Sequence, residues 1–133
     1  MRKLTPGDDR GTMVKLFAVL RRRQDMSTEE FVAHWRDVHG PLIAGEPTLA
    51  RHIVRYEQHV RHRPEALSGT EDVDGVAVQW FESMDDFVGF VSEPKYAELI
   101  APDERRFLDL DRLEYVICEE PTVVIDGSVP GDG

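Results

Sequence analysis

Two helix-start signals constrain the fold of this chain more than any other feature. Ser27 with Glu30, and Ser83 with Asp86, have the spacing of a capping box, in which the serine hydroxyl accepts a hydrogen bond from the backbone of the first helical turn. An apolar stripe at helical spacing follows each pair and begins at Phe31 in the first helix. Segments with strand character surround both helices, so helices and strands alternate along the chain.

Four segments rich in β-branched and aromatic residues predict strands: Val14–Leu20, Leu49–Val60, Gly75–Phe81 and Leu113 to about Val124. The resulting order, β-α-β-β-α-β, is typical of a ferredoxin-like α+β fold with a four-stranded antiparallel sheet. Two helices can cover only one face of such a sheet. Because apolar residues occupy both faces of the third strand, we expect two copies to pack their uncovered sheet faces together as a homodimer.

Prolines set the expected helix ends. The first helix is expected to run to about His39 and to stop before Pro41, because the residue before a proline avoids helical backbone angles. The second helical region is expected to continue from Pro94 and to break at Pro102.

Length and charge bound the class of protein. The chain has 133 residues, a formal net charge of −10 and a single cysteine, which excludes an internal disulfide framework and a cysteine-based zinc cluster. We expect a mobile leader over 1–12, one folded domain over 13–125 and a flexible tail over 126–133, with either Met1 or Met13 as the natural start. The negative field repels phosphate groups and no apolar run could span a bilayer, so we expect no nucleic-acid or membrane partner and a cytoplasmic location.

The segment HWRDVHGPL, residues 34–42, holds the clearest candidate site residue. On a regular helix His39 lies at the edge of the apolar face around Trp35, where the chain must turn. A half-buried imidazole there would have a lowered pKa and could accept a proton near neutral pH. His34 lies five positions earlier, so the two rings should point apart, share no metal, and leave His34 in solvent.

Several segments occur in the order and spacing of a known family. They are STEEFVAHWRDVHGPL (27–42), RYEQHV (55–60), DGVAVQWFESMDDF (74–87), the turn Pro94-Lys95-Tyr96, DERRFLD (103–109) and Glu119-Glu120. With these segments the chain resembles the EthD family of the dimeric α/β-barrel superfamily. The resemblance implies ferredoxin-like protomers that join sheet to sheet into a barrel. It also implies relatives that act as cofactor-free cyclases, dehydratases, decarboxylases or isomerases on aromatic or polyketide-type compounds.

A cleft between the helices and the sheet is the expected place for a small-molecule pocket. The candidate catalytic residues are His39, Tyr56 and His52. The candidate substrate-binding residues are Trp35, Trp80 and Phe87. Tyr56 could polarise a carbonyl, and His52 would share its face of the expected strand. Asp103 and Glu104, near a helix start, are expected to be structural. No metal or cofactor site is predicted.

The leading hypothesis is a cofactor-independent lyase, isomerase or cyclase in which His39 moves a proton on a small aromatic or polyketide-like molecule. A non-catalytic dimeric binding or accessory protein is the main alternative. A haem-binding barrel and a cofactor-free monooxygenase are less favoured alternatives. The sequence therefore leaves open whether the chain is an enzyme.

Overall fold

The computed structural model describes residues 13–62 and 72–127, and a four-stranded sheet is its central layer. The strands are β1 Val14–Leu20, β2 Arg55–Val60, β3 Gly75–Phe81 and β4 Glu114–Cys118. Their order across the sheet is β2-β3-β1-β4, and every neighbouring pair is antiparallel. This arrangement confirms the predicted ferredoxin-like α+β fold.

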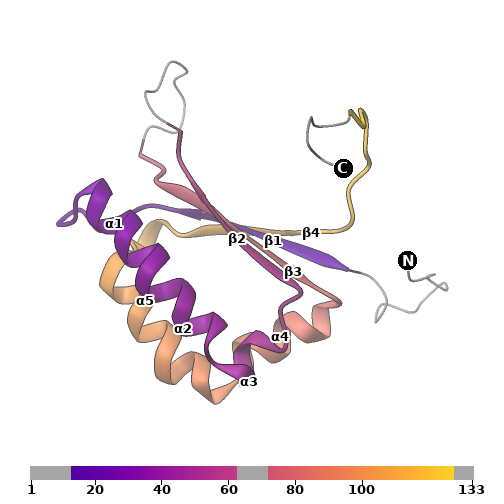
Figure 1. Cartoon of the computed structure of the whole chain (residues 1–133), viewed down its shortest axis with the longest axis horizontal. Coiled ribbons are helices and arrows are strands. Elements are labelled where there is room, and N and C mark those ends of the chain that lie inside the picture. The colour runs from indigo at the N-terminus through magenta and orange to yellow at the C-terminus, as the bar shows by residue number, and fades with distance from the viewer. Residues whose placement is uncertain (1–12, 63–71, 128–133) are drawn as a thin grey trace.

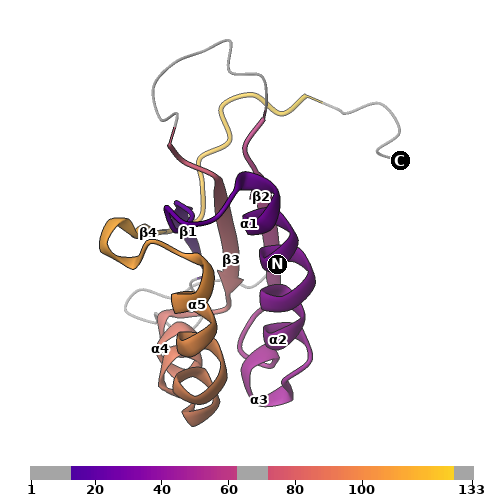
Figure 2. The ribbon, with the colours of Figure 1, turned by 90° about the vertical axis from the view of Figure 1, so that its left-hand side faces the viewer.

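All the labelled helices lie on one face of the sheet (Figure 1). They are α1 Thr28–His34, α2 Gly40–Ala44, α3 Pro47–Ala50, α4 Met84–Ser92 and α5 Ala101–Phe107. Turning the molecule shows them as two neighbouring columns, α1 to α3 in one and α4 with α5 in the other (Figure 2). Ser27 and Ser83 cap α1 and α4 as the sequence predicts, each accepting from a backbone N–H three residues on.

Neither Pro41 nor Pro102 ends its helix, which corrects the expected helix ends. The π-helical turn Trp35–His39 comes just before Pro41, and α2 follows it without a break. The π-helical turn Tyr96–Ile100 comes just before Pro102, and α5 follows it without a break. In the first π turn the Gly40 N–H bonds to the carbonyl of Trp35, five residues back. A proline has no N–H and its ring collides with the carbonyl four residues back in a regular helix. The extra residue of a π turn reroutes these hydrogen bonds, so the chain stays helical through the proline.

Two predicted strands are shorter than expected, because a strand extends only where its partner does. The start of the predicted strand Leu49–Val60 is instead helical, since Glu46 caps α3 through the Thr48 N–H, and the ladder begins where Arg55 pairs with Trp80. The last strand ends at Cys118, which pairs with Lys15 at the start of β1, and does not reach Val124.

The core between sheet and helices has two apolar parts. One part contains Val14, Ile43, Leu49, Phe81, Phe90 and Ile100. The other contains Leu20, Phe31, Trp35, Phe107 and Leu108. This division leaves room for a cavity at the point where the two parts meet.

The predicted leader and most of the predicted tail lie outside the described residues. Within 13–62 and 72–127, no helix combines the length and the apolar character needed to cross a membrane. In the same ranges, no three His, Cys, Asp or Glu side chains gather closely enough to hold a metal ion.

Candidate functional site

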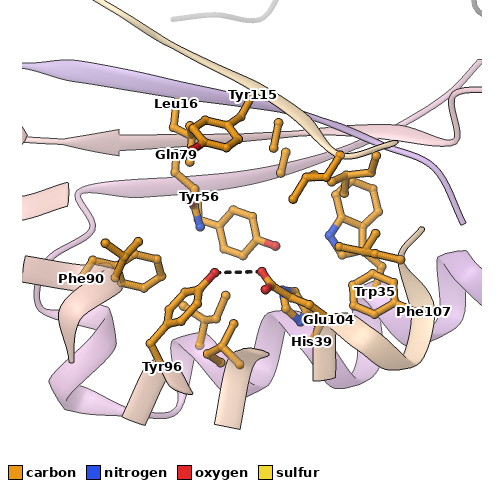
Figure 3. A pocket seen from close by; sticks show the side chains of 18 of the residues that line it. Leu16, Trp35, His39, Tyr56, Gln79, Phe90, Tyr96, Glu104, Phe107 and Tyr115 are labelled. Atoms are coloured by element: carbon orange, nitrogen blue, oxygen red, sulfur yellow. Dashed lines mark hydrogen bonds between the residues drawn. The ribbon is translucent and has the colours of Figure 1, made fainter. Parts of the chain in front are cut away.

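A pocket of about 220 Å³ lies between the sheet and the two helical columns. Its lining is mainly apolar, and its floor is formed by Leu16, Ala18 and Ala77 of the sheet. The polar side chains that reach it are His39, Tyr56, Gln79, Tyr96, Glu104 and Tyr115. In the close view, Tyr56 reaches in from the sheet, while His39, Tyr96 and Glu104 reach in from the helices (Figure 3). Few polar groups in an apolar hollow are typical of a small-molecule site.

The two π turns supply much of the helical wall. Trp35 and His39 come from the first turn, and Tyr96 and Ile100 come from the second. A wider turn changes which side chains share a helix face, and such turns are frequent at functional sites. Each proline is accommodated by a π turn, and the π turns place these side chains in the wall of the pocket.

Asp103, on the helical column of α4 and α5, contacts both His34 and His39, which lie on the other column. His39 Nδ1 and His34 Nε2 each lie 2.9 Å from one of the two carboxylate oxygens of Asp103. Arg106 Nη1 lies 3.3 Å from the same carboxylate, whose residue is fully buried. The structure corrects two expectations: His34 is bonded rather than solvated, and its ring reaches the same carboxylate as His39. On a regular helix the two rings would point apart, whereas the residues between the two histidines form a π turn.

This contact determines the protonation of the His39 ring. A carboxylate only accepts hydrogen bonds, so Nδ1 carries a proton and donates it to Asp103, which leaves Nε2 unprotonated in the neutral ring. Burial lowers the pKa of His39 below its ordinary value, and the hydrogen bond and charge of Asp103 oppose this shift. In the part of the chain that the structure describes, Nε2 has no hydrogen-bond partner. His39 therefore presents a neutral base to the pocket.

The pKa of Asp103 itself is held below its ordinary value. Burial alone would raise it, but the hydrogen bonds from His39 and His34 outweigh the loss of solvent. The carboxylate is therefore ionised at neutral pH and keeps both imidazole rings in place.

Tyr56 brings a phenol into the pocket from β2. Its hydroxyl oxygen accepts a hydrogen bond from Gln58 Nε2 at 3.1 Å, and the same amide group donates to the carbonyl of Trp35 at 2.9 Å. Burial raises the pKa of Tyr56, against the hydrogen bonds from Gln58 and Trp35. The phenol therefore keeps its proton, and it can donate that proton to an oxygen atom in the pocket.

Glu104 and Tyr96 form a second polar pair that the sequence reasoning did not find. The Tyr96 hydroxyl donates to Glu104 Oε2 at 2.9 Å, and both side chains line the pocket. Burial raises the pKa of Glu104, and the charge of Asp103 adds to this shift. The DERRFLD segment is the available signal, although acidic residues at this position are also typical of a helix start. The structure instead turns Asp103 toward the histidines and Glu104 toward the cavity.

The other predicted site residues separate into two groups. Trp35 and Phe87 line the pocket together with His39 and Tyr56. His52 does not line it, because β2 begins after this residue and His52 Nε2 instead contacts Glu93 at 2.6 Å. Trp80 lies on the opposite sheet face, where the amine of Lys15 is 4.8 Å from its ring centre.

Comparison with known proteins gives one family and two relatives that are both named as dehydratases. The family model for the EthD domain matches residues 23–111. The conidial pigment biosynthesis dehydratase EthD of Metarhizium robertsii is 28% identical over 102 residues, which cover 68% of this chain and 70% of the relative. The dehydratase aurZ of Gibberella zeae is 25% identical over 130 residues, which cover 89% of this chain and 84% of the relative.

Solved structures share the fold at lower identity. A dimeric protein of unknown function and ferredoxin-like fold from Bacteroides fragilis has a TM-score of 0.61 at 18% identity and covers 81% of this chain and 96% of its own. An EthD-family protein from Bacillus halodurans has a TM-score of 0.62 at 16% identity, with 82% and 99% covered. A hydroxynitrile lyase from Passiflora edulis has a TM-score of 0.60 at 15% identity, with 90% and 99% covered.

Proposed function

This chain belongs to the EthD family, as the sequence predicted, and we propose that it is a cofactor-independent lyase that removes water from a small aromatic or polyketide-like molecule. The contact that carries this proposal is the one between His39 and Asp103, which leaves an unprotonated imidazole nitrogen at an apolar pocket. The two curated relatives are both named as dehydratases, which supports the choice of water as the group removed.

The size of the cavity supports a ligand with one aromatic ring. A cavity of about 150 Å³ can hold benzene. The pocket here, at about 220 Å³, has room for such a ring with a short substituent. Trp35, Phe87, Phe90 and Phe107 would contact the ring, because all four line the pocket.

His39 would begin the reaction by removing a proton. Its Nε2 would take a proton from a carbon next to a carbonyl, since such a C–H is acidic enough for an imidazole base. The ionised Asp103 would hold the ring in the required tautomer and would stabilise the imidazolium that forms. His34 would hold Asp103 from its other oxygen atom.

Tyr56 would stabilise the negative charge that develops on the carbonyl oxygen. Its hydroxyl already accepts from Gln58, so its own proton can point toward the substrate. The apolar surroundings would strengthen this hydrogen bond, because little water competes for it.

A single substitution tests the role of His39. Wild-type protein should convert a β-hydroxyketone with one phenyl ring, the aldol adduct of benzaldehyde and acetone, to its conjugated enone, which absorbs in the near ultraviolet. His39→Gln should lose about a hundred-fold or more of this rate. His62→Gln is the matched control, because His62 is an exposed histidine just beyond the end of β2. Equal rates for His39→Gln and the control would refute the mechanism, and binding of the ketone without any turnover would favour a binding protein.

The uncovered face of the sheet supports a homodimer. Phe17, Val76, Trp80 and Val116 lie on this face, and Val116 is 55% exposed in a single chain. Such an apolar surface is costly to leave in water. The ferredoxin-like protein from Bacteroides fragilis is described as dimeric. We therefore propose that two protomers pack these faces together into an α/β barrel.

A further inference from the structure

Glu104 and Asp103 are neighbours on α5, yet they have opposite surroundings. Asp103 contacts His34, His39 and Arg106, which are donors that favour its charged form. Glu104 faces the cavity, where the Tyr96 hydroxyl is its hydrogen-bond donor. Two adjacent carboxyl groups are thus set up for two different protonation states.

The wall around Glu104 offers little to stabilise a negative charge. Among the residues that line the pocket there is no lysine or arginine, and Ile43, Phe90 and Ile100 belong to that lining. Burial raises the pKa of Glu104, and the like charge of Asp103 adds to this shift. The hydrogen bond from Tyr96 and the charge of Arg105 favour the ionised form, but they do not outweigh the burial. Only Oε2 is occupied by the Tyr96 hydroxyl, so a proton on Oε1 can be directed into the cavity.

The close view shows where such a proton could go. The hydroxyl of Tyr56, the hydroxyl of Tyr96 and the carboxyl of Glu104 point toward one another inside the pocket (Figure 3). A molecule held there would contact the carbonyl polariser and the carboxyl group at the same time. Elimination of water needs both groups, because hydroxide is a poor leaving group unless it receives a proton as it departs.

We propose that Glu104 is the catalytic acid that protonates the departing hydroxyl, with Tyr96 as the positioning residue that orients its carboxyl group. This inference rests on the proposed function. It assigns a β-hydroxy carbonyl compound as the substrate class, since the acidic C–H must be next to the carbonyl and the hydroxyl on the next carbon.

The step balances in protons and electrons. His39 Nε2 takes the proton from the carbon next to the carbonyl, and that electron pair forms the new C=C bond. The C–O bond breaks with its electrons on oxygen, which receives the Glu104 proton and leaves as water. The protein is left with a protonated His39 and an ionised Glu104. It returns to its starting state when one proton moves from His39 to Glu104 through solvent.

A pair of probes that differ only in the leaving group tests this role. The first probe is the phenyl-bearing β-hydroxyketone, and the second is its O-acetyl ester, whose acetate leaves without needing a proton. Both give the same enone. Glu104→Gln should reduce the rate of enone formation about a hundred-fold with the alcohol and only a few-fold with the ester. His39→Gln should lose the rate on both probes, because both need the base.

Two further measurements separate a chemical role from a structural one. Tyr96→Phe should also impair the alcohol more than the ester. The wild-type rate on the alcohol should fall as the pH rises through the raised pKa of Glu104, and this fall should be absent on the ester. Glu98→Gln is the matched control on the same helical segment, because Glu98 is 59% exposed and pairs with Lys95.

The outcomes distinguish this inference from the proposed function. Equal losses on alcohol and ester in Glu104→Gln would overturn the role of Glu104 and leave His39 as the base. Wild-type turnover of the ester without turnover of the alcohol would also overturn it, because no proton would then reach the leaving group. Failure of the wild type on both probes, or full activity of His39→Gln, would overturn the proposed lyase function itself.

Discussion

Replacement of Asp103 by asparagine should destabilise the protein by about 2–3 kcal/mol. The carboxylate accepts hydrogen bonds from His34 and His39 at 2.9 Å each, in a residue with no solvent exposure. A hydrogen bond to a charged group contributes about 1.5–3 kcal/mol, and the single amide oxygen can retain one weaker bond. The third partner, Arg106, has a 63% exposed side chain, so its ion pair adds little. For a domain of this size the loss corresponds to about 8–12 °C in melting temperature.

The same substitution should reduce the proposed activity beyond its effect on stability. The new amide group can donate to His39 Nδ1, which would move the ring proton to Nε2 and remove the base from the pocket. In a comparable buried pair of aspartate and histidine, such a change costs about 10⁴-fold in turnover. We expect a loss of about a thousand-fold or more on the ester probe, which does not depend on Glu104.

Urea unfolding followed by far-ultraviolet circular dichroism measures the change in the free energy of unfolding. Asp111→Asn is the control, since Asp111 is exposed and forms no hydrogen bond or ion pair in the part of the chain described. Because the folded-state pKa of Asp103 is lowered, its contribution is fully present above the unfolded pKa of about 4 and is lost as the pH falls through the folded value. A neutral-pH difference below about 0.5 kcal/mol between Asp103→Asn and the control would refute the reasoning.

The remaining predictions concern packing, the pocket boundary and assembly. Gly75→Ala should cost about 1–3 kcal/mol in urea unfolding, because the added Cβ would lie 2.6 Å from a ring carbon of Trp35; an unchanged midpoint would contradict this packing. His52→Gln should leave turnover of the β-hydroxyketone within about two-fold of wild type, since His52 contacts Glu93 outside the pocket, and a large loss would place it in the reaction. Phe17→Glu should convert the proposed dimer to monomer in analytical ultracentrifugation, because it buries a charge in the sheet face, and an unchanged dimer would locate the interface elsewhere.

The candidate site was only partly predictable, and two residues explain why. A regular helix separates positions five apart and predicts His34 in solvent, but the π turn over Trp35–His39 brings both rings to Asp103. The position of Glu104 predicts a helix-start charge, and nothing in its local sequence indicates that Tyr96 would meet it in a cavity. The pocket is lined by four residues that the sequence predicts for the site, namely Trp35, His39, Tyr56 and Phe87. Apolar periodicity and strand parity are local properties, and they indicate inward positions without knowledge of the fold.

Local sequence alone determined the order of the elements and the buried face of the first helical region, which holds Phe31 and Trp35. The serine caps and the β-branched and aromatic strands act over a few residues, so they predict the ferredoxin-like fold without knowledge of long-range contacts. Only the tertiary structure decided the lengths of β2 and β4, the continuation of both helices through proline, and the environment of each carboxyl group. A strand ends where its partner ends, and a carboxyl group takes its protonation from neighbours that lie far away in the sequence. His39 and Asp103 are 64 positions apart, and their contact exists only because the two helical columns pack against the same sheet.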